Sequence, residues 1–250
     1  MRNQLTLLIP YRRRELAFNS FYNWLKWTKK QNNYFSSMEI ILIENDLSPT
    51  LTIKQQALDL KIKYYFIEGD GIFHKTYLLN SALKLVETKY LMAYDIDLIP
   101  YKNSLFKHWQ LTAKSNDFLV TGYRLMLEES YLYKFDLLED NIKGAKIAPE
   151  DQPTALKKHL ISFEKMGVLP IFETEKIIKI GGWDENFIGW GGEDQDLIQR
   201  YCFADNLSIC KVPELLYLHL AHDYQLDWYS SEIITQNRNY YYQKYYHESD

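Results

Sequence analysis

Four continuous apolar segments, with helical spacing after the first and the third, restrict this chain to a small number of folds. Short runs without polar alternation are typical of strands that are buried on both faces. The predicted strands are Leu5–Ile9, Ile40–Ile43, Tyr64–Ile67 and Tyr90–Tyr94. Apolar residues recur at helical spacing after the first strand, as in Phe18, Phe21 and Leu25, and after the third, as in Leu78, Ala82 and Leu85. Strand–helix alternation of this kind predicts an α/β fold with a mostly parallel mixed sheet flanked by helices.

The second half of the chain is less regular but continues to predict strands and helices. Short strands are expected at Phe118–Val120, Leu169–Phe172, Ile209–Val212 and Leu215–Leu220. Helices are expected from Thr174 to Ile180 and from about Glu193 to Ala204, and residues 139–154 are expected to form an exposed loop. For the tyrosine-rich tail, Tyr240 to Tyr246, we expect packing rather than a sugar-facing surface. No internal repeat or linker divides the chain, so we expect a single domain, 1–250.

Composition excludes several classes of protein. A net charge of −4 argues against a nucleic-acid binder, which normally carries a basic face. Cys202 and Cys210 provide no disulfide framework and are expected to be reduced. The sequence contains no apolar stretch of about 20 residues, so it predicts no transmembrane segment. We therefore expect a cytoplasmic protein, although peripheral membrane contact, or excision from a longer anchored protein, would fit the same composition.

The most informative polar motif is Asp95-Ile96-Asp97, which follows the apolar strand Tyr90–Tyr94. Two carboxylates at positions i and i+2 point the same way, into the crevice where open α/β sheets bind ligands. Such oxygen ligands suit a divalent cation. The alternative is an ordinary turn, where Asp is common. Because Leu98-Ile99-Pro100 keeps the following chain apolar, a turn into solvent is the weaker interpretation.

A second acidic motif is Trp190-Gly191-Gly192-Glu193-Asp194, just before Gln195 and Asp196. Acidic residues are favoured in the first turn of any helix, which is a purely structural explanation for them. It does not explain the glycines around a large aromatic side chain, a combination suited to a mobile sugar-binding lid. A carboxylate beside such a lid can act as general base. We expect the helix dipole to lower the pKa of Asp194 and keep it ionised.

Paired histidines follow the last predicted strand. A single histidine there would more often be a hydrogen-bonded core residue. His219 and His222 can instead converge on one metal ion if the chain bends between them.

A cationic run follows the first strand. The run consists of Arg12, Arg13 and Arg14. One interpretation is a solvated start of a helix. The other is a diphosphate-binding site, because guanidinium groups suit phosphate oxygens. Phe73-His74-Lys75, after the third strand, offers an aromatic face to a base and a cation to a phosphate.

Taken together, these motifs resemble the inverting β-1,4-galactosyltransferase family and its bacterial and N-acetylgalactosaminyltransferase relatives, which share the GT-A (Rossmann-like) fold. The resemblance rests on residues 9–16, 73–80, 94–100 and 181–196 and on the paired histidines. It implies that residues 1–100 form the nucleotide-sugar-binding half and residues 101–250 the acceptor-binding and catalytic half.

The resemblance also implies a role for each motif residue. Asp97, His219 and His222 would ligate Mn²⁺ or another divalent cation such as Mg²⁺. Asp194 would deprotonate an acceptor hydroxyl, and Glu193 would bind sugar hydroxyls. The residues implied to contact the UDP-sugar donor are Pro10, Tyr11, Arg12, Arg14, Phe73, Lys75, Asp95, Trp190 and Gly192. Trp190 would also stack near the saccharide or glycoconjugate acceptor.

Three departures from the family pattern leave the substrates open. Lys75 stands where animal members usually have Arg, and Gln195 replaces an acidic residue that helps hold N-acetylglucosamine. Residues 163–168 lack the pattern found near the 2-substituent of the donor, so Gal and GalNAc cannot be separated.

The sequence therefore predicts a metal-dependent inverting glycosyltransferase that uses one displacement. Two alternatives are a nucleotidyltransferase, which would release pyrophosphate instead of UDP, and a non-catalytic saccharide-binding protein with the same fold.

Overall fold

The four apolar segments of the first half form neighbouring parallel strands of one sheet. The computed structural model describes residues 4–31, 37–127, 146–147, 170–220 and 230–246. The strands are β1 (Leu5–Tyr11), β2 (Met38–Asp46), β3 (Lys63–Glu68) and β4 (Tyr90–Ala93), and the sheet order is β3-β2-β1-β4-β8. The first four strands are parallel, while the two-residue strand β8 (Phe172–Glu173) runs antiparallel to β4.

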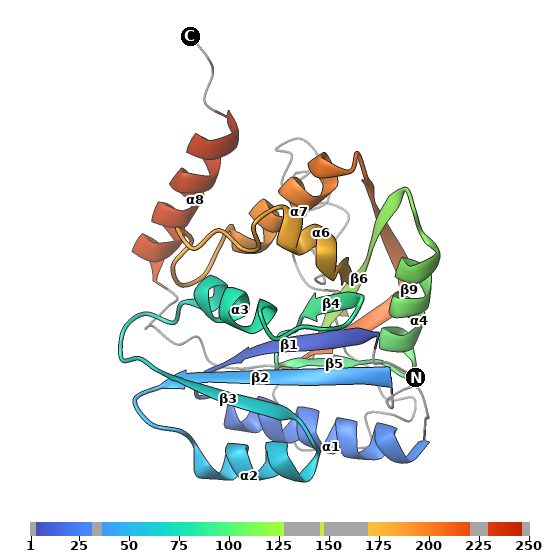
Figure 1. Ribbon diagram of the computed structural model, residues 1–250, viewed down its shortest axis with the longest axis vertical. Coiled ribbons are helices and arrows are strands. Elements are labelled where there is room, and N and C mark those ends of the chain that lie inside the picture. The colour runs from blue at the N-terminus through green and yellow to red at the C-terminus, as the bar shows by residue number, and fades with distance from the viewer. Residues whose placement is uncertain (1–3, 32–36, 128–145, 148–169, 221–229, 247–250) are drawn as a thin grey trace.

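Helices cover both faces of this sheet, as expected for strands without polar alternation (Figure 1). Helices α1 (Glu15–Gln31) and α2 (Leu51–Asp59) lie on one face, and α3 (Lys75–Leu83) lies on the other. Successive residues of β1 alternate between the two faces: Leu7 and Ile9 join one hydrophobic core and Leu8 joins the second.

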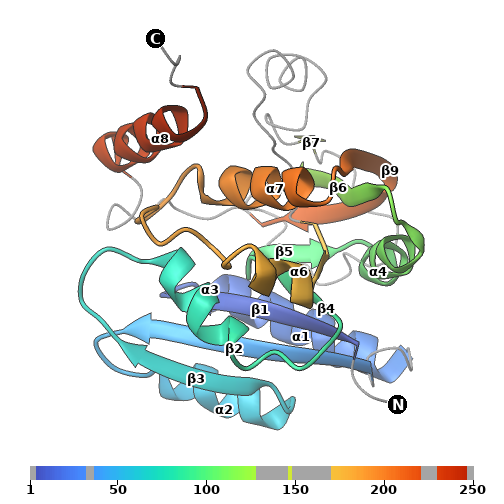
Figure 2. The ribbon, with the colours of Figure 1, turned by 45° about the horizontal axis from the view of Figure 1, so that its top comes forward.

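A second sheet joins the first directly after β4. Its strands are β5 (Leu98–Pro100), β6 (Phe118–Met126), β7 (Lys146–Ile147) and β9 (Ser208–His219), in the order β5-β9-β6-β7. Strands β6 and β9 are parallel, whereas β5 and β7 pair in the antiparallel direction. Helix α4 (Ser104–Lys114) connects β5 to β6. Figure 2 shows β5 between β9 and the strands of the first sheet.

Three more helices complete the described part of the second half. Helix α6 (Thr174–Lys179) follows β8, and α7 (Glu193–Ala204) lies beside it above the first sheet (Figure 1). The tyrosine-rich tail is a helix, α8 (Ser231–Tyr246), which had not been predicted. Tyr241 on its inner side is buried, so the expected packing is confirmed.

The predicted fold class is confirmed, and several details of the sequence interpretation are corrected. Helices α2 and α4 and strand β5 were not anticipated, and only Ile53 and Ala57 of the short helix α2 are buried. The strand expected at 169–172 is β8, which begins only at Phe172. The two strands expected at 209–212 and 215–220 form the single strand β9. Most of the predicted 139–154 loop lies outside the described residues, but Lys146–Ile147 within it pairs with β6.

Candidate active site

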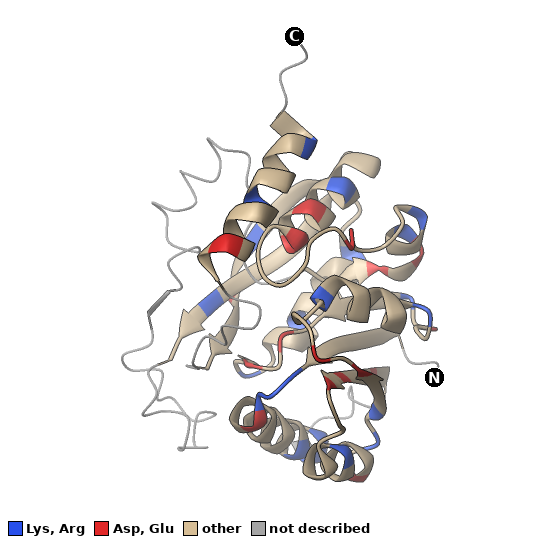
Figure 3. Cartoon of the chain, turned by 90° about the vertical axis from the view of Figure 1, so that its left-hand side faces the viewer, with Lys and Arg blue, Asp and Glu red and all other residues tan. Residues whose placement is uncertain are grey.

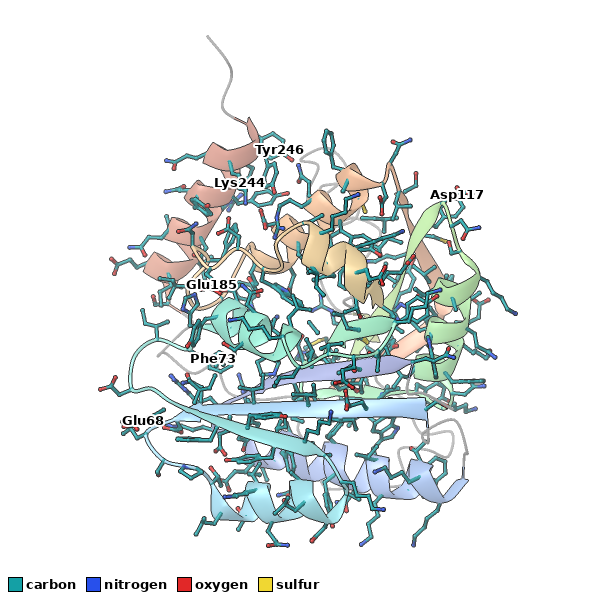
Figure 4. The ribbon with its side chains drawn as sticks, viewed as in Figure 1. Glu68, Phe73, Asp117, Glu185, Lys244 and Tyr246 are labelled. Atoms are coloured by element: carbon teal, nitrogen blue, oxygen red, sulfur yellow. The ribbon has the colours of Figure 1, made fainter. Side chains whose placement is uncertain are left out.

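The carboxyl ends of the parallel strands open to one edge of the first sheet. This edge is on the left in Figure 1 and faces the reader in Figure 3, where both acidic and basic residues are present on it. Phe73 and Glu185, labelled in Figure 4, lie on this same side of the molecule. The edge is where open α/β sheets usually bind ligands.

The Asp95–Asp97 motif lies at the junction of the two sheets. The Tyr94 amide donates to the Leu8 carbonyl at 2.8 Å, which extends the β1–β4 pairing up to the motif. The Leu98 amide then donates to the Asp95 carbonyl at 3.0 Å, and β5 begins immediately. Asp97 is buried, while the Asp95 side chain is half-buried. The motif is therefore fixed on both sides by strand pairing.

Pairing between β5 and β9 brings Asp97 and His219 together. Leu98 is opposite His219 in the register, and the Leu220 amide donates to the Asp97 carbonyl at 2.9 Å. His219 Nε2 lies 3.7 Å from Asp97 Oδ1. His222, the third predicted metal ligand, lies outside the described residues. Among the residues that are described, no group of three or more His, Cys, Asp or Glu side chains forms a metal cluster.

The second acidic motif opens helix α7, as predicted. Gly192 is the residue before the helix and has φ of 87°, a conformation that favours glycine. A side chain at Gly192 would also meet the Phe187 ring at 2.8 Å. Glu193 is buried, and its Oε2 accepts a hydrogen bond from the Gly191 amide at 2.9 Å. The glycines thus allow the chain to turn sharply and bury an acidic side chain at the helix start.

Lys75 joins the two acidic motifs. It begins α3, and its Nζ lies 3.1 Å from Asp194 Oδ2, 3.3 Å from Glu193 Oε1 and 3.5 Å from Asp95 Oδ1. Burial lowers the pKa of Lys75, but the charges of these carboxylates outweigh it and hold the pKa well above its usual range. The ammonium group is therefore a fixed positive charge among three carboxylates from two distant segments.

The structure corrects the expected ionisation of Asp194. Burial raises the pKa of Asp194, Lys75 opposes the rise, and Glu193 and Asp95 add to it, so that the pKa lies at about 7. The helix dipole was expected to lower this pKa, but removal from water and two neighbouring negative charges have the larger effect. A carboxylate with a pKa near neutrality is well matched to accepting a proton at that pH.

Arg12, predicted to contact a nucleotide, holds the strand-end loops together. Its Nε donates to the Asn45 carbonyl at 2.6 Å and its Nη1 to the Gly71 carbonyl at 2.7 Å. Its guanidinium carbon lies 5.4 Å from the centre of the Phe73 ring. Because Arg12 and Phe73 are both buried, the guanidinium group supports the aromatic ring from inside the protein.

The other residues predicted to bind the nucleotide lie around the end of β1. Pro10 is opposite Ile43 in the sheet, and Arg14 is half-buried where α1 begins. The Tyr11 ring is buried and packs edge-on against Phe18 at 5.9 Å. A ligand at this edge would therefore meet the main chain of Tyr11 and not its ring.

Trp190 is partly exposed, with 43% of its surface accessible. Its main chain is held by α8: Asn237 Nδ2 donates to the Ile188 carbonyl at 2.8 Å and to the Trp190 carbonyl at 3.0 Å. Sequence reasoning had missed Asn237. A hydrogen bond to a main-chain carbonyl does not depend on the type of the accepting residue, so the sequence does not show which residue donates to it. A helical pattern in the tail is the one signal that could have pointed to Asn237.

Most of the predicted site residues therefore fall into two groups. In the first group, Lys75 contacts Asp95, Glu193 and Asp194. His219 lies 3.7 Å from Asp97, which is two residues after Asp95 in the sequence. Pro10, Tyr11, Arg12, Arg14 and Phe73 belong to the strand ends and loops of the same sheet edge.

Comparisons with known proteins agree with this fold. The model of a family described as the N-terminal domain of galactosyltransferase matches residues 155–223, which is less than half of the chain. No curated protein matches the sequence significantly. No helix of the described residues is both long and apolar enough to span a membrane.

Two solved structures share the architecture. One is the mannosyltransferase PcManGT from Pyrobaculum calidifontis in complex with GDP-Man and Mn²⁺, with a TM-score of 0.55, 14% identity and 88% of this chain covered. The other is S. aureus TarS, with a TM-score of 0.60, 14% identity and 87% covered. This chain spans 57% and 37% of their respective lengths. The fold is that of the GT-A glycosyltransferases.

Proposed function

We propose that this chain is a metal-dependent, inverting glycosyltransferase that moves Gal, GalNAc or a related hexose from a UDP-sugar to a saccharide hydroxyl. The observation that carries the proposal is the meeting of the two acidic motifs at Lys75, at the ligand-binding edge of the sheet. One motif suits a cation and a diphosphate, and the other suits proton removal from a hydroxyl. The GT-A fold and the galactosyltransferase family match support this assignment.

The donor set near Asp97 fits a divalent cation such as Mn²⁺ or Mg²⁺. A carboxylate oxygen and an imidazole nitrogen 3.7 Å apart are both ligands that Mn²⁺ accepts. Asp97 and His219 would hold the ion, with His222 as the proposed third ligand. When bound, the cation would neutralise negative charge on the departing diphosphate.

Asp194 is the proposed general base. As the acceptor oxygen attacks the anomeric carbon, its proton passes to the Asp194 carboxylate while the bond from that carbon to the UDP oxygen breaks. Attack and departure occur on opposite faces, so the configuration at the anomeric carbon inverts. Glu193, fixed by Lys75 and the Gly191 amide, would accept hydrogen bonds from sugar hydroxyls.

The donor would lie along the strand ends. Phe73 would face the uracil, with Arg12 fixing the loop that carries it. Pro10, Arg14 and the main chain of Tyr11 would line the nucleotide, and Asp95 would accept from the ribose or the sugar. To contact a phosphate, the Lys75 ammonium group would have to give up one or more of its carboxylate partners.

A panel of nucleotide-sugars with Mn²⁺ tests the proposal. The first measurement is the rise in melting temperature with each of four donors: UDP-Gal, UDP-GalNAc, UDP-Glc and GDP-Man. The second identifies the products released from each donor with and without a mixture of monosaccharide acceptors. Because a ligand stabilises the folded state it binds, UDP-sugars should raise the melting temperature more than GDP-Man, and UDP should be released. A larger shift with GDP-Man would contradict the donor, and release of pyrophosphate would indicate a nucleotidyltransferase.

A further inference from the structure

Helix α8 is attached to the whole segment that leads into α7. Tyr240 lies with its hydroxyl 2.9 Å from Asp184 Oδ2 and its ring 5.0 Å from that of Phe187. Lys244 Nζ lies 2.6 Å from Asp184 Oδ2 and 2.7 Å from Asp196 Oδ1. Lys244 and Glu185, labelled in Figure 4, mark the two sides of this contact. The helix therefore joins the beginning of the segment to the first turns of α7.

Asn237 is the contact of α8 nearest to Trp190. It is buried, and one nitrogen atom donates to two carbonyls, those of Ile188 and Trp190, on either side of Gly189. The Asn237 carbonyl also lies close to Gly192, 3.6 Å from where a side chain would begin. A buried amide that donates to two main-chain carbonyls restrains the path of the chain between them, because losing the donor would remove a buried hydrogen bond from each acceptor.

The glycines around these carbonyls do not by themselves select one backbone conformation. Gly189, Gly191 and Gly192 all have positive φ, with values of 76°, 109° and 87°. Glycine has access to many more backbone conformations than other residues, so its observed conformation must be selected by outside contacts. Side-chain hydrogen bonds to this stretch come from Asn237 and from Glu193, and the Asp196 amide donates to the Gly192 carbonyl at 2.9 Å.

We infer that Asn237 is a positioning residue that sets the place of the Ile188–Gly192 segment and thereby of Trp190. Its consequence for acceptor use rests on the proposed transferase function. Its structural consequence does not: without the Nδ2 donor, the segment should sample other conformations while α8 stays attached through Tyr240 and Lys244.

Hydrogen exchange measured by mass spectrometry tests the inference. Asn237→Asp keeps the size of the side chain but removes the donor, and Asn239→Asp makes the same change at an exposed position of the same helix. Amides of residues 188–192 should exchange about tenfold faster in Asn237→Asp, because two buried hydrogen bonds are lost. Asn239→Asp should leave their exchange unchanged. Exchange within α8 and α7 should stay within about twofold in both variants.

The measurement separates positioning from general loosening. Equal exchange at 188–192 in the wild type and in Asn237→Asp would overturn the inference, and so would an increase spread evenly over α7 and α8. Asn237→Ser is measured in parallel, because its shorter side chain cannot donate to both carbonyls. If the aspartate variant does not fold, the same increase in exchange at residues 188–192 is expected in Asn237→Ser, and its absence would overturn the inference.

A binding measurement keeps this inference separate from the proposed function. Calorimetry with UDP and Mn²⁺ should give the same Kd, within about threefold, for the wild type and Asn237→Asp, because the side chains of α8 bond to the segment before α7 and to α7 itself. If the wild type does not bind UDP, the proposed donor is wrong while the exchange result still stands. A large loss of UDP affinity in Asn237→Asp alone would overturn positioning of the Trp190 segment as the main role.

Discussion

The two acidic motifs of the site are held in place by different means. Asp95 and Asp97 lie between β4 and β5, and main-chain hydrogen bonds to Leu8 and from Leu220 fix the chain on both sides. Glu193 and Asp194 follow a glycine-rich segment, where side chains such as Lys75 and Asn237 provide the fixed points. The first motif can move only if strand pairing breaks, whereas the second can move if a few side chains change partners.

This difference fits a division of labour in the proposed reaction. A metal–diphosphate site gains from rigid ligands, because their arrangement need not be rebuilt at each turnover. The acceptor side must admit and release a saccharide, which favours a segment that opens at low cost. The strand-held motif should therefore respond to mutation by losing binding, and the side-chain-held motif by losing rate or changing its pH dependence.

The largest expected effect is at the strand-held motif. Asp97→Ala should abolish Mn²⁺-dependent UDP binding and reduce transfer below detection, because it removes the charged member of the proposed metal-binding pair Asp97–His219. Calorimetry and the melting temperature measure binding and folding separately. Asp117→Ala, on the opposite side of the molecule in Figure 4, is the control. Unchanged affinity in Asp97→Ala would remove this residue from the metal site.

A smaller effect is expected at the helix-borne motif. Asp194→Asn should lower turnover by about 10²–10⁴-fold, the usual contribution of general-base catalysis, while UDP affinity stays within a few-fold. Steady-state kinetics and calorimetry measure the two effects. Asp205→Asn, at the other end of α7, should have normal kinetics. Near-normal transfer by Asp194→Asn would contradict its role and leave Glu193 as the next candidate.

The smallest expected effect is a shift in pH dependence. With the pKa of Asp194 at about 7, kcat/KM should rise as pH increases through about 7, because only the ionised carboxylate accepts a proton. Lys75 lowers this pKa, so Lys75→Met should move the rise to higher pH. Lys84→Met, an exposed position at the end of α3, should not. The same rise at the same pH in Lys75→Met would show that Lys75 does not control Asp194.

The raised pKa of Asp194 also makes the free energy of unfolding depend on pH. Its value lies above the ordinary 3.8, so the folded protein holds this proton more tightly than the unfolded chain does. The contribution of Asp194 therefore favours the folded state at low pH and is lost as pH rises from about 4 to about 7. This is the reverse of the usual behaviour of a carboxylate in an ion pair.

Buried strands and the start of α7 could be predicted from the sequence because their signals are local. Strands covered on both faces are apolar throughout, and α7 has the predicted limits because glycines precede an acidic first turn. Strand β9 was divided in two because Pro213, which cannot donate a hydrogen bond, lies where its register with β6 shifts. A proline in a run normally argues for a break, and here the chain continues past it.

The parts of the site that could not be predicted depend on contacts between distant segments. The Lys75 position among three carboxylates, and hence the pKa of Asp194, follow from how α3 packs against the start of α7. Neither burial nor this approach is visible in the sequence around Asp194. The contacts of Asn237 and Lys244 also could not be predicted, because the tyrosine-rich sequence of the tail shows no clear helical periodicity and the helix α8 was not expected.

The order of strands in the second sheet has a consequence for how the protein folds. Strand β9 lies between β5 and β6, yet it follows both in the chain. During synthesis these two strands must leave the ribosome with one edge unpaired, and exposed edges invite association with other chains. Because Asp97 and His219 also meet only when β9 is inserted, closing the sheet and assembling the proposed metal-binding pair are one event. Variants that slow the insertion of β9 should therefore aggregate during folding even where the finished protein is stable.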